Sequence, residues 1–354
     1  EQGHATLTIS HDGRVSCDRG IIGHDDASTG DVTVSNGANL ISSGGLDVGF
    51  NGFGTLSITN DGTVTSGECS IGDGFESTGV VTVRDNSRWD LSGDLYVGRS
   101  GRGTLNISSG SEVGGDYVFI GEGYDSVGEV TVSDNATWNP HQVRVGVSGD
   151  GSLEISNNGT VDSDEGYIGY EPDSTGSVTV SGSGSWWDSG ELHVGERGSG
   201  ELMILNGGVV DGSHERGVIG YDFDSTGAVS VSGESSMWGI AELYVGMSGD
   251  GVLSVSDGGT VNSWNSYIGY GQGASGAVTV NGAGSVWTCG ALHVGEEGSG
   301  SLLISNGGEV RSDNTFSVIA LTSDSVGDVT VSGPDSTWRT GELHVGGYGS
   351  GALV

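Results

Sequence analysis

The sequence predicts an all-β fold: a parallel β-helix (solenoid) of about 14 coils, each of about 24 residues. The main observation is a segment that returns along the chain, as "STGSVTVSGSGSWWDSGELHVG" from Ser174 and "ASGAVTVNGAGSVWTCGALHVG" from Ala274. Between its copies lies a second, related segment, such as "GTLSITNDGTVTSGECSIG" from Gly54. Repetition at a fixed period is the signature of stacked architectures.

Both segments share one skeleton of alternating apolar residues interrupted by turns. Val178 and Val180 point to one side of an expected strand, and Thr179 points to the other. Glycines recur at fixed offsets where tight turns are needed. Successive coils therefore start about 24 residues apart, and two unlike coils make a repeat of about 50. The first apolar residues of the coils are Leu7, Val32, Leu56, Val81, Leu105, Val130, Leu153, Val178, Leu202, Val229, Leu253, Val278, Leu302, Val329 and Leu353.

One coil cannot bury its own apolar face, whereas stacked coils can. We expect about three short strands and three turns in each coil, and a single solenoid over residues 1–354 with seven repeats and the start of an eighth. The chain reads as a fragment of a longer protein. A β-propeller is the rival fold, but a blade needs four antiparallel strands, and this repeat divides into two similar halves. The expected core includes Leu153, Ile155, Val161, Ile168, Val178, Val180, Trp187, Leu192 and Val194.

The chain is strongly acidic, with a formal net charge of −36. All 11 basic residues are arginines. Phosphate binding needs a basic surface, so nucleic acid is not an expected partner. No apolar run reaches the 18 residues of a membrane-spanning helix, so no membrane-spanning segment is expected. The three cysteines (Cys17, Cys69 and Cys289) are too few and too scattered for a disulfide framework.

A tryptophan occupies one slot in each repeat after the first. In the alternate coils the same slot holds valine, which indicates core packing, with the indole N–H bonded to a turn carbonyl. The alternative is an exposed tryptophan ladder, spaced ~10 Å apart along the stack, that contacts a glycan. The tryptophans of this slot are Trp89, Trp138, Trp187, Trp238, Trp287 and Trp338.

A second series, the outward ladder, consists of the residues just before the last apolar residue of each coil. Both neighbours of this slot point inward, so it is expected to face outward. Aromatic, His and Arg side chains suit the faces and hydroxyls of sugars, although they also stack on one another for stability. The candidate glycan-binding face is Tyr96, Phe119, Arg144, Tyr167, His193, Tyr244, Tyr267, His293 and His344.

One acidic residue accompanies the "STG" or "SVG" turn in most repeats, with Asp125, Asp173 and Asp224 as weak calcium candidates. Calcium takes six to eight oxygen ligands, which one carboxylate per ~10 Å does not supply. We therefore expect solvated turns, no cofactor and no other metal site.

The copies such as "GSVTVSGSGSWWDSGELHVGERGSGELMILNGGVV" resemble the repeat associated with type V secretion and PEP-CTERM proteins. The resemblance covers essentially the whole chain. It implies a right-handed β-helix, similar to an autotransporter passenger, outside a bacterial cell. It implies no catalytic residue for this chain.

The predicted function is an extracellular structural and adhesive rod of a bacterial surface or secreted protein. A polysaccharide-binding module that uses the outward ladder is the alternative. A polysaccharide-degrading β-helix enzyme is less favoured, because most polar residues recur with the repeat and a catalytic site is singular. Among the departures from the repeat, His214, Glu215 and Arg216 are contiguous, and contiguous residues rarely converge. Expected partners are an extracellular polysaccharide and, through the open strand edges, other copies of the chain end to end.

Overall fold

The computed structural model describes residues 3–354, apart from the side chains of residues 213, 313 and 314. Every helix or strand assigned within this range is a β-strand, as expected for an all-β parallel solenoid. The chain divides into two compact units, Glu1–Gly166 with Asp173–Val178, and Tyr167–Pro172 with Thr179–Val354. Strands β16 (Glu165–Ile168) and β17 (Thr175–Ser181) contain residues of both units. The single domain over residues 1–354 stays a prediction.

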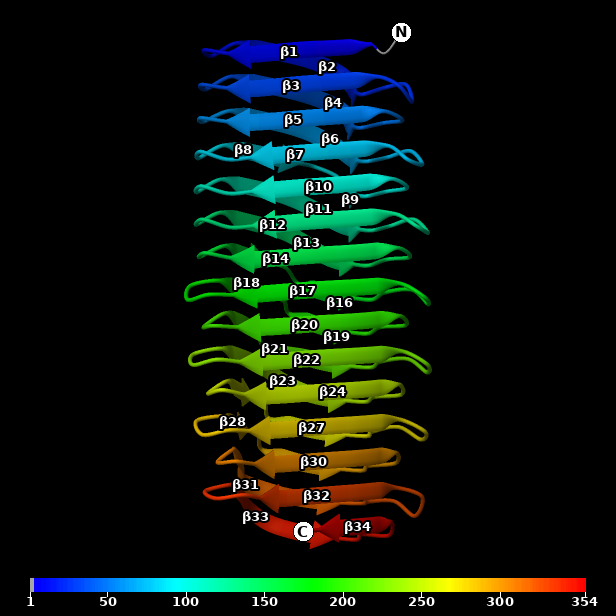
Figure 1. Ribbon diagram of the computed structural model, residues 1–354, viewed down its shortest axis with the longest axis vertical. Helices are drawn as coiled ribbons and strands as arrows, with labels where there is room; N and C mark the ends of the chain where they lie inside the picture. Colours follow the sequence, from blue (N-terminus) through cyan, green and yellow to red (C-terminus); the bar gives the residue numbers. More distant parts are fainter. Residues whose placement is uncertain (1–2) are drawn as a thin grey trace. The chain divides into compact units, whose positions relative to one another are not determined.

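The first sheet of unit 1 takes one strand from each coil. Figure 1 shows β1, β3, β5 and β7 lying side by side, and each pair is parallel. The apolar residues that open successive coils are direct partners, as in Leu56↔Val81 and Val81↔Leu105. The alignment of coils predicted from the sequence is therefore confirmed at residue level in these strands. They are β1 (His4–Ser10), β3 (Thr29–Ser35), β5 (Phe53–Thr59), β7 (Thr78–Val83), β10 (Arg102–Ile107), β12 (Val127–Val132) and β14 (Asp150–Ser156).

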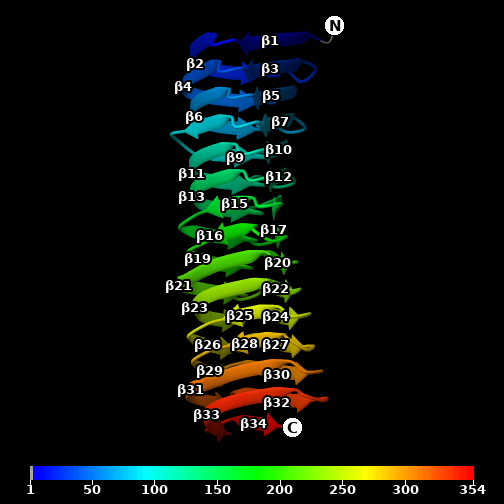
Figure 2. The ribbon, with the colours of Figure 1, turned by 90° about the vertical axis from the view of Figure 1, so that its left-hand side faces the viewer.

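The remaining strands of unit 1 form the second face of the solenoid, which is turned toward the viewer in Figure 2. In some coils two short strands lie here, and in others they fuse into one long strand. The long β2 and β4 pair with a register shift at the bend. The prediction of three strands in every coil is thus correct only for the coils in which the second face has two short strands. Coils with one long strand on this face have two strands. These strands are β2 (Arg14–Ile22), β4 (Asn39–Val48), β6 (Thr63–Ile71), β8 (Arg88–Leu91), β9 (Leu95–Val97), β11 (Glu112–Ile120), β13 (Thr137–Val145) and β15 (Thr160–Asp162).

Unit 2 repeats the arrangement of the first sheet. Its strands are parallel, and Leu253 pairs with Val278, which in turn pairs with Leu302. The register again follows the predicted coil starts. The strands are β20 (Ser199–Leu205), β22 (Thr226–Ser232), β24 (Asp250–Ser256), β27 (Ser275–Asn281), β30 (Ser299–Ser305), β32 (Val326–Ser332) and β34 (Ser350–Leu353).

The second face of unit 2 contains the two longest strands, β21 and β31, of 11 residues each. They belong to the two coils that are longer in the sequence. Each pairs with the following strand through a register shift, so the additional residues are accommodated at the bend. The strands of this face are β18 (Trp186–Asp188), β19 (Glu191–Val194), β21 (Val209–Ile219), β23 (Met237–Val245), β25 (Thr260–Asn262), β26 (Asn265–Ile268), β28 (Val286–Thr288), β29 (Ala291–Val294), β31 (Glu309–Ile319) and β33 (Thr337–Val345).

The alternating apolar residues fill the interior of the coils. All nine residues predicted for the core are buried, and none is more than 1% exposed. Trp89 lies in register with Val64 of the preceding coil and Val113 of the following one. The tryptophan slot is therefore a core slot, and the exposed glycan ladder of tryptophans is excluded for the five that are fully buried: Trp89, Trp138, Trp187, Trp238 and Trp287.

A left-handed residue ends most coils, and glycine usually supplies it. Gly72 has a φ of 71°, and a Cβ there would lie 2.2 Å from the backbone oxygen of Arg102. Its N–H donates to the carbonyl of Val48 in the coil before. The glycine thus closes the turn while the neighbouring coils approach closely.

Candidate functional site

The outward ladder of unit 1 is formed by Tyr96 on β9, Phe119 on β11 and Arg144 on β13. Phe119 is the direct partner of Tyr96 on one side and of Arg144 on the other. The rings of Tyr96 and Phe119 stack with centroids 5.0 Å apart and planes at 10°. The guanidinium of Arg144 lies 5.3 Å from the centroid of Phe119. Neighbouring side chains therefore cover the ring faces, and the three residues remain half-buried.

In unit 2 the ladder contains Tyr244 on β23, Tyr267 on β26 and His293 on β29, in direct register. Tyr244 and Tyr267 stack at 4.9 Å and 13°, and the ring of His293 lies 5.1 Å from Tyr267. Valines interrupt the series, since Val218 precedes Tyr244 and Val318 separates His293 from His344. His344 is exposed, and its Nε2 lies 2.9 Å from Glu342.

His193 is outward in register but is not accessible, because it is only 4% exposed. The expectation that its ring is open to a ligand is therefore wrong. Its Nε2 lies 2.8 Å from Glu191, and its Nδ1 contacts Glu196. The rings of Tyr167 and Tyr221 lie 5.1 and 4.8 Å away. This histidine is packed as a structural member of the ladder.

A second column, three residues after the ladder, was missed by the sequence reasoning. Each of its members follows the left-handed residue that ends the coil, and Tyr270 packs edge-on against both Tyr244 and Tyr267. Two other residues of this column pack against the ladder in the same way: Tyr221 against His193, and Arg99 against Tyr96. The signal was present as the recurring "IGY" segment, but the turn brings this residue back against the ladder, and its direction is not readable from strand alternation.

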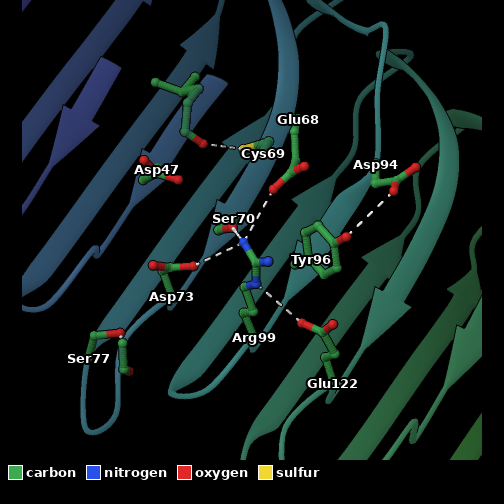
Figure 3. A network of polar contacts seen from close by, with 12 residues as sticks. Asp47, Glu68, Cys69, Ser70, Asp73, Ser77, Asp94, Tyr96, Arg99 and Glu122 are labelled. Carbon is green, nitrogen blue, oxygen red and sulfur yellow. Dashed lines mark hydrogen bonds and ion pairs between the residues drawn. The ribbon is translucent and has the colours of Figure 1, made fainter. Parts of the chain in front are cut away.

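Arg99 is the centre of a polar network in unit 1 (Figure 3). Its guanidinium lies 4.4 Å from the ring centroid of Tyr96. It also contacts the carboxylates of Glu68 at 3.2 Å, Glu122 at 3.4 Å and Asp73 at 3.5 Å. One positive charge thus faces three negative charges, so the cluster is under-neutralised.

The charges around Arg99 perturb their neighbours. Burial, together with the charges of Asp73 and Glu68, raises the pKa of Glu122 against the opposing effect of Arg99. Burial likewise raises the pKa of Asp47, although Arg19 bonds to its carboxylate at 2.7 Å. Burial and nearby carboxylates raise the pKa of Tyr96 to about 12, so its phenol stays neutral. Protons are therefore held more tightly here than on free side chains.

A comparable arrangement in unit 2 surrounds Glu191. Burial raises its pKa, but hydrogen bonds from Arg216 and His193 outweigh that effect and lower it overall. Burial and the carboxylate of Glu242 raise the pKa of Tyr244 above its usual range. The carboxylates of Glu191 and Glu242 therefore lie beside the ladder residues His193 and Tyr244.

Three tryptophans of the core slot bond to serines rather than to turn carbonyls, which corrects the expected partner for them. The indole N–H groups of Trp89, Trp287 and Trp338 each donate at 3.1 Å to a serine hydroxyl of the preceding coil. The serine stands two residues after the partner valine, as Ser66 follows Val64. Within residues 3–354, the indole N–H groups of Trp138 and Trp238 lack any hydrogen-bond partner.

The three calcium candidates, Asp125, Asp173 and Asp224, are exposed turn residues. Their φ angles of 62°, 65° and 66° are left-handed, a conformation that Asp adopts more readily than most residues. Among the side chains described, no group of three or more His, Cys, Asp or Glu could hold a metal ion. The expectation of solvated turns without calcium stays a prediction, and calcium titration of the purified protein is the measurement that tests the three candidates.

The non-repeating segment at His214 forms part of a hollow of about 330 Å³. Asp188, Asp211, His214 and Glu215 line it, and the two aspartates are direct partners on neighbouring strands. Arg216 does not join them, because its guanidinium bonds to Glu191. The contiguous trio therefore divides between two places.

No protein-family model and no curated protein matches the sequence. Among solved structures, the chain is similar to the crystal structure of a TibA fragment whose hyper-glycosylation is catalysed by TibC. The TM-score is 0.56 and the sequence identity 17%, with 96% of this chain and 97% of that chain covered. The likeness supports an autotransporter-passenger-like β-helix as the fold. The PEP-CTERM association stays a prediction.

Within residues 3–354 the structure holds no helix with the length and apolar character needed to cross a membrane.

Proposed function

We propose that the protein is an extracellular structural and adhesive β-helical rod of a bacterial surface or secreted protein. The observation that carries this proposal is the register, in which every coil offers the next the same apolar slots, as Leu56, Val81 and Leu105 do. Such a stack gains stability from nearest neighbours and extends by addition of coils. The ladder supports the same role, because its rings stack between coils.

Two measurements test the rod. Small-angle scattering of the purified chain is expected to give a maximum dimension several times the cross-section. Antibodies against the chain are expected to label intact cells of the bacterium that makes it, and external protease to remove that label. A compact globular scattering curve, or a protein found only inside the cell, contradicts the proposal.

The second candidate function is polysaccharide binding by the outward ladder. The half-buried rings of Tyr244 and Tyr267, with Glu242 accepting a hydrogen bond from the Tyr244 hydroxyl at 3.3 Å, favour it. Aromatic surface and hydroxyl acceptors together suit sugars. Weak sites repeated along one polymer add through effective concentration.

The test of this candidate is the double variant Tyr244→Ala/Tyr267→Ala, assayed against neutral and anionic glycans with and without calcium. Binding that rises with glycan length in the wild type and is lost in the variant supports the candidate. Tyr348→Ala is the control, because Tyr348 is 85% exposed and lies outside the ladder. If the wild type binds no glycan, or the variant binds as well, the ladder is only a stabilising stack.

We also propose that the chain has no catalytic activity of its own, since most of its polar side chains recur with the repeat. Release of reducing ends from a polysaccharide panel by the purified protein would overturn this. End-to-end pairing of copies of the chain through unpaired strand edges is a further proposal. A monomer by light scattering at high concentration contradicts it.

A further inference from the structure

A hollow of about 360 Å³ in unit 2 lies beside Trp264. Its lining residues come from β26, β28 and β31 and from the connections that precede β26 and follow β28; Figure 2 shows these strands in the yellow and orange part of the chain. The other lining residues that matter here are Asn265, Thr288, Gly290 and Thr315. The volume falls within the range of small-molecule sites, about 300–1,000 Å³.

Trp264 stands in the connection between β25 and β26, and its backbone is held from both sides. Its N–H donates to the carbonyl of Ala241 at 2.8 Å, and its carbonyl accepts from Gly290 at 2.6 Å and from Ala291 at 3.0 Å. A Cβ on Gly290 would lie 2.4 Å from the Trp264 oxygen. The glycine is thus needed for this approach, and the indole rests on a fixed main chain.

The indole itself is 75% exposed, in contrast to Trp287, which is fully buried. The core therefore gives no reason for a tryptophan at this position. An exposed aromatic ring on a fixed backbone beside a hollow suits ligand binding, because little conformational entropy is lost when the ligand is bound.

The polar groups of the hollow are neutral where they are described. Asn265 and Thr288 are half-buried and Thr315 is exposed. The hydroxyl of Ser263 is already used, since it bonds to Ser266 and accepts from Trp287. An amide and two hydroxyls are thus available to a ligand.

The related hollow one hundred residues earlier has a different chemistry. In that hollow, Gly190 is equivalent to Gly290. Two neutral residues of the later hollow are acidic in the earlier one: Thr288 corresponds to Asp188, and Thr315 corresponds to Glu215. The same bend of the coil thus forms both hollows, one lined by carboxylates and the other by neutral groups with an indole. Among the described lining residues of the two hollows, carboxylates occur only in the earlier one.

We propose that the Trp264 hollow binds one neutral sugar residue. The apolar face of the pyranose lies on the indole, and its hydroxyls bond to Asn265, Thr288 and Thr315. Neutral donors and acceptors match hydroxyls, whereas an ammonium ion would find one ring and no described carboxylate in the lining. The site is separate from the outward ladder and does not depend on it.

The test uses methyl glycosides of glucose, galactose and mannose as probes, with indole fluorescence and saturation-transfer NMR as the two readouts. We expect saturable binding of at least one glycoside, with a dissociation constant of ~1–10 mM, as for a weak single contact. Trp264→Ala is expected to abolish this binding and to leave the melting temperature unchanged, because the indole is exposed. Asn265→Ala is expected to weaken binding while keeping the fluorescence of the indole.

Phe223→Ala is the matched control, since Phe223 is also an exposed aromatic residue of unit 2, at 69%, and lies outside the hollow. It is expected to bind as the wild type does. The proposal is overturned if no glycoside binds, if Trp264→Ala binds as well as the wild type, or if choline binds through Trp264 and the glycosides do not. None of these outcomes bears on the scattering and labelling tests of the rod.

Discussion

The indole N–H of Trp89 donates a hydrogen bond at 3.1 Å to the hydroxyl of Ser66, one coil earlier in the core. In the coil before Trp138, the position equivalent to Ser66 is Gly115, and in the coil before Trp238 it is Gly212. Glycine has no hydroxyl, so the indole N–H groups of Trp138 and Trp238 have no hydrogen-bond partner there. A buried donor without a partner costs about 1–3 kcal/mol. The repeat therefore contains its own matched pair of satisfied and unsatisfied tryptophans.

We expect Gly115→Ser to stabilise the protein by about 1–2 kcal/mol, from the new hydrogen bond to Trp138 and from reduced freedom of the unfolded backbone. There is room for the side chain, because a Cβ on Gly115 meets only Val118, at 3.8 Å. Urea unfolding of unit 1, followed by circular dichroism, is the measurement. Gly115→Ala isolates the backbone part, and a serine variant no more stable than the alanine variant refutes the bond.

The same change in unit 2 is expected to have the opposite sign. A Cβ on Gly212 would lie 2.5 Å from the backbone oxygen of Gly190. Gly212→Ser should therefore cost about 1–3 kcal/mol through the enforced backbone shift, although Trp238 lacks a partner. Thermal unfolding measures it, and a melting temperature at or above that of the wild type contradicts the steric argument.

Replacement of single tryptophans by phenylalanine is expected to separate packing from hydrogen bonding. Trp89→Phe and Trp138→Phe remove the same volume from the same slot, but only Trp89 loses a bond, to Ser66. We expect Trp89→Phe to be the more destabilising by about 1 kcal/mol. If denaturant unfolding shows that both variants lose the same free energy of unfolding, the hydrogen bond between Trp89 and Ser66 makes no net contribution to stability.

Arg99→Met is expected to destabilise unit 1 by about 1 kcal/mol at pH 7, since it leaves three carboxylates uncompensated while the methionine keeps the packing of the stem. The pKa of Glu122 is already raised above its ordinary 4.5, and the loss of Arg99 raises it further. A carboxyl group whose pKa is higher in the folded than in the unfolded protein destabilises the fold at pH values above the folded pKa, because it must ionise in an unfavourable place. This destabilisation disappears as the pH falls through the folded pKa and the group becomes protonated.

The loss of stability in Arg99→Met, relative to the wild type, should therefore be greatest near pH 7 and become smaller as the pH falls toward 4. The melting temperatures of both proteins, recorded near pH 7 and near pH 4, measure this difference. Arg84→Met is the control, because Arg84 pairs with Asp85 at 2.8 Å on the surface and is 53% exposed. A deficit that grows on acidification contradicts the argument.

Native-state labelling with iodoacetamide at neutral pH is expected to modify Cys17 first. Burial raises the pKa of the Cys69 thiol well above its usual value and that of Cys289 to about 12, and both are buried, whereas Cys17 is half-buried. The thiolate is the reactive form. Mass spectrometry after labelling is the readout, with all three modified once the chain is unfolded. Native labelling of Cys69 as fast as Cys17 would show that this coil opens.

The repeat was sufficient to predict the coils and their register, because period-two alternation specifies which side of a strand is buried, and each apolar residue then finds its equivalent one coil away. Leu105 against Val130 is one such pair. The bends were less predictable, because whether a strand breaks there depends on register shifts that no local sequence pattern reports.

The surroundings of the candidate site were the least predictable part. Alternation places Tyr244 and His193 outward, but it does not reveal that Tyr270 or Tyr221 returns across the turn to cover them. Nor does alternation distinguish the indole N–H of Trp89, which lies against the hydroxyl of Ser66, from that of Trp138, which has Gly115 at the equivalent position. These outcomes depend on contacts between coils at distances of a few ångströms, which composition and spacing do not encode.

The matching register of Val81, Leu105, Val130 and Leu153 has a consequence for how such a gene can change. Loss of a segment encoding two coils places Leu153 against Val81, where Leu105 was, and every interior position keeps a residue of the same type. Duplication of that segment is equally compatible with the fold. A shift by a single codon instead turns the strand's apolar side chains toward water. Recombination between repeats can therefore alter the number of coils in whole steps, while small insertions inside strands are selected against.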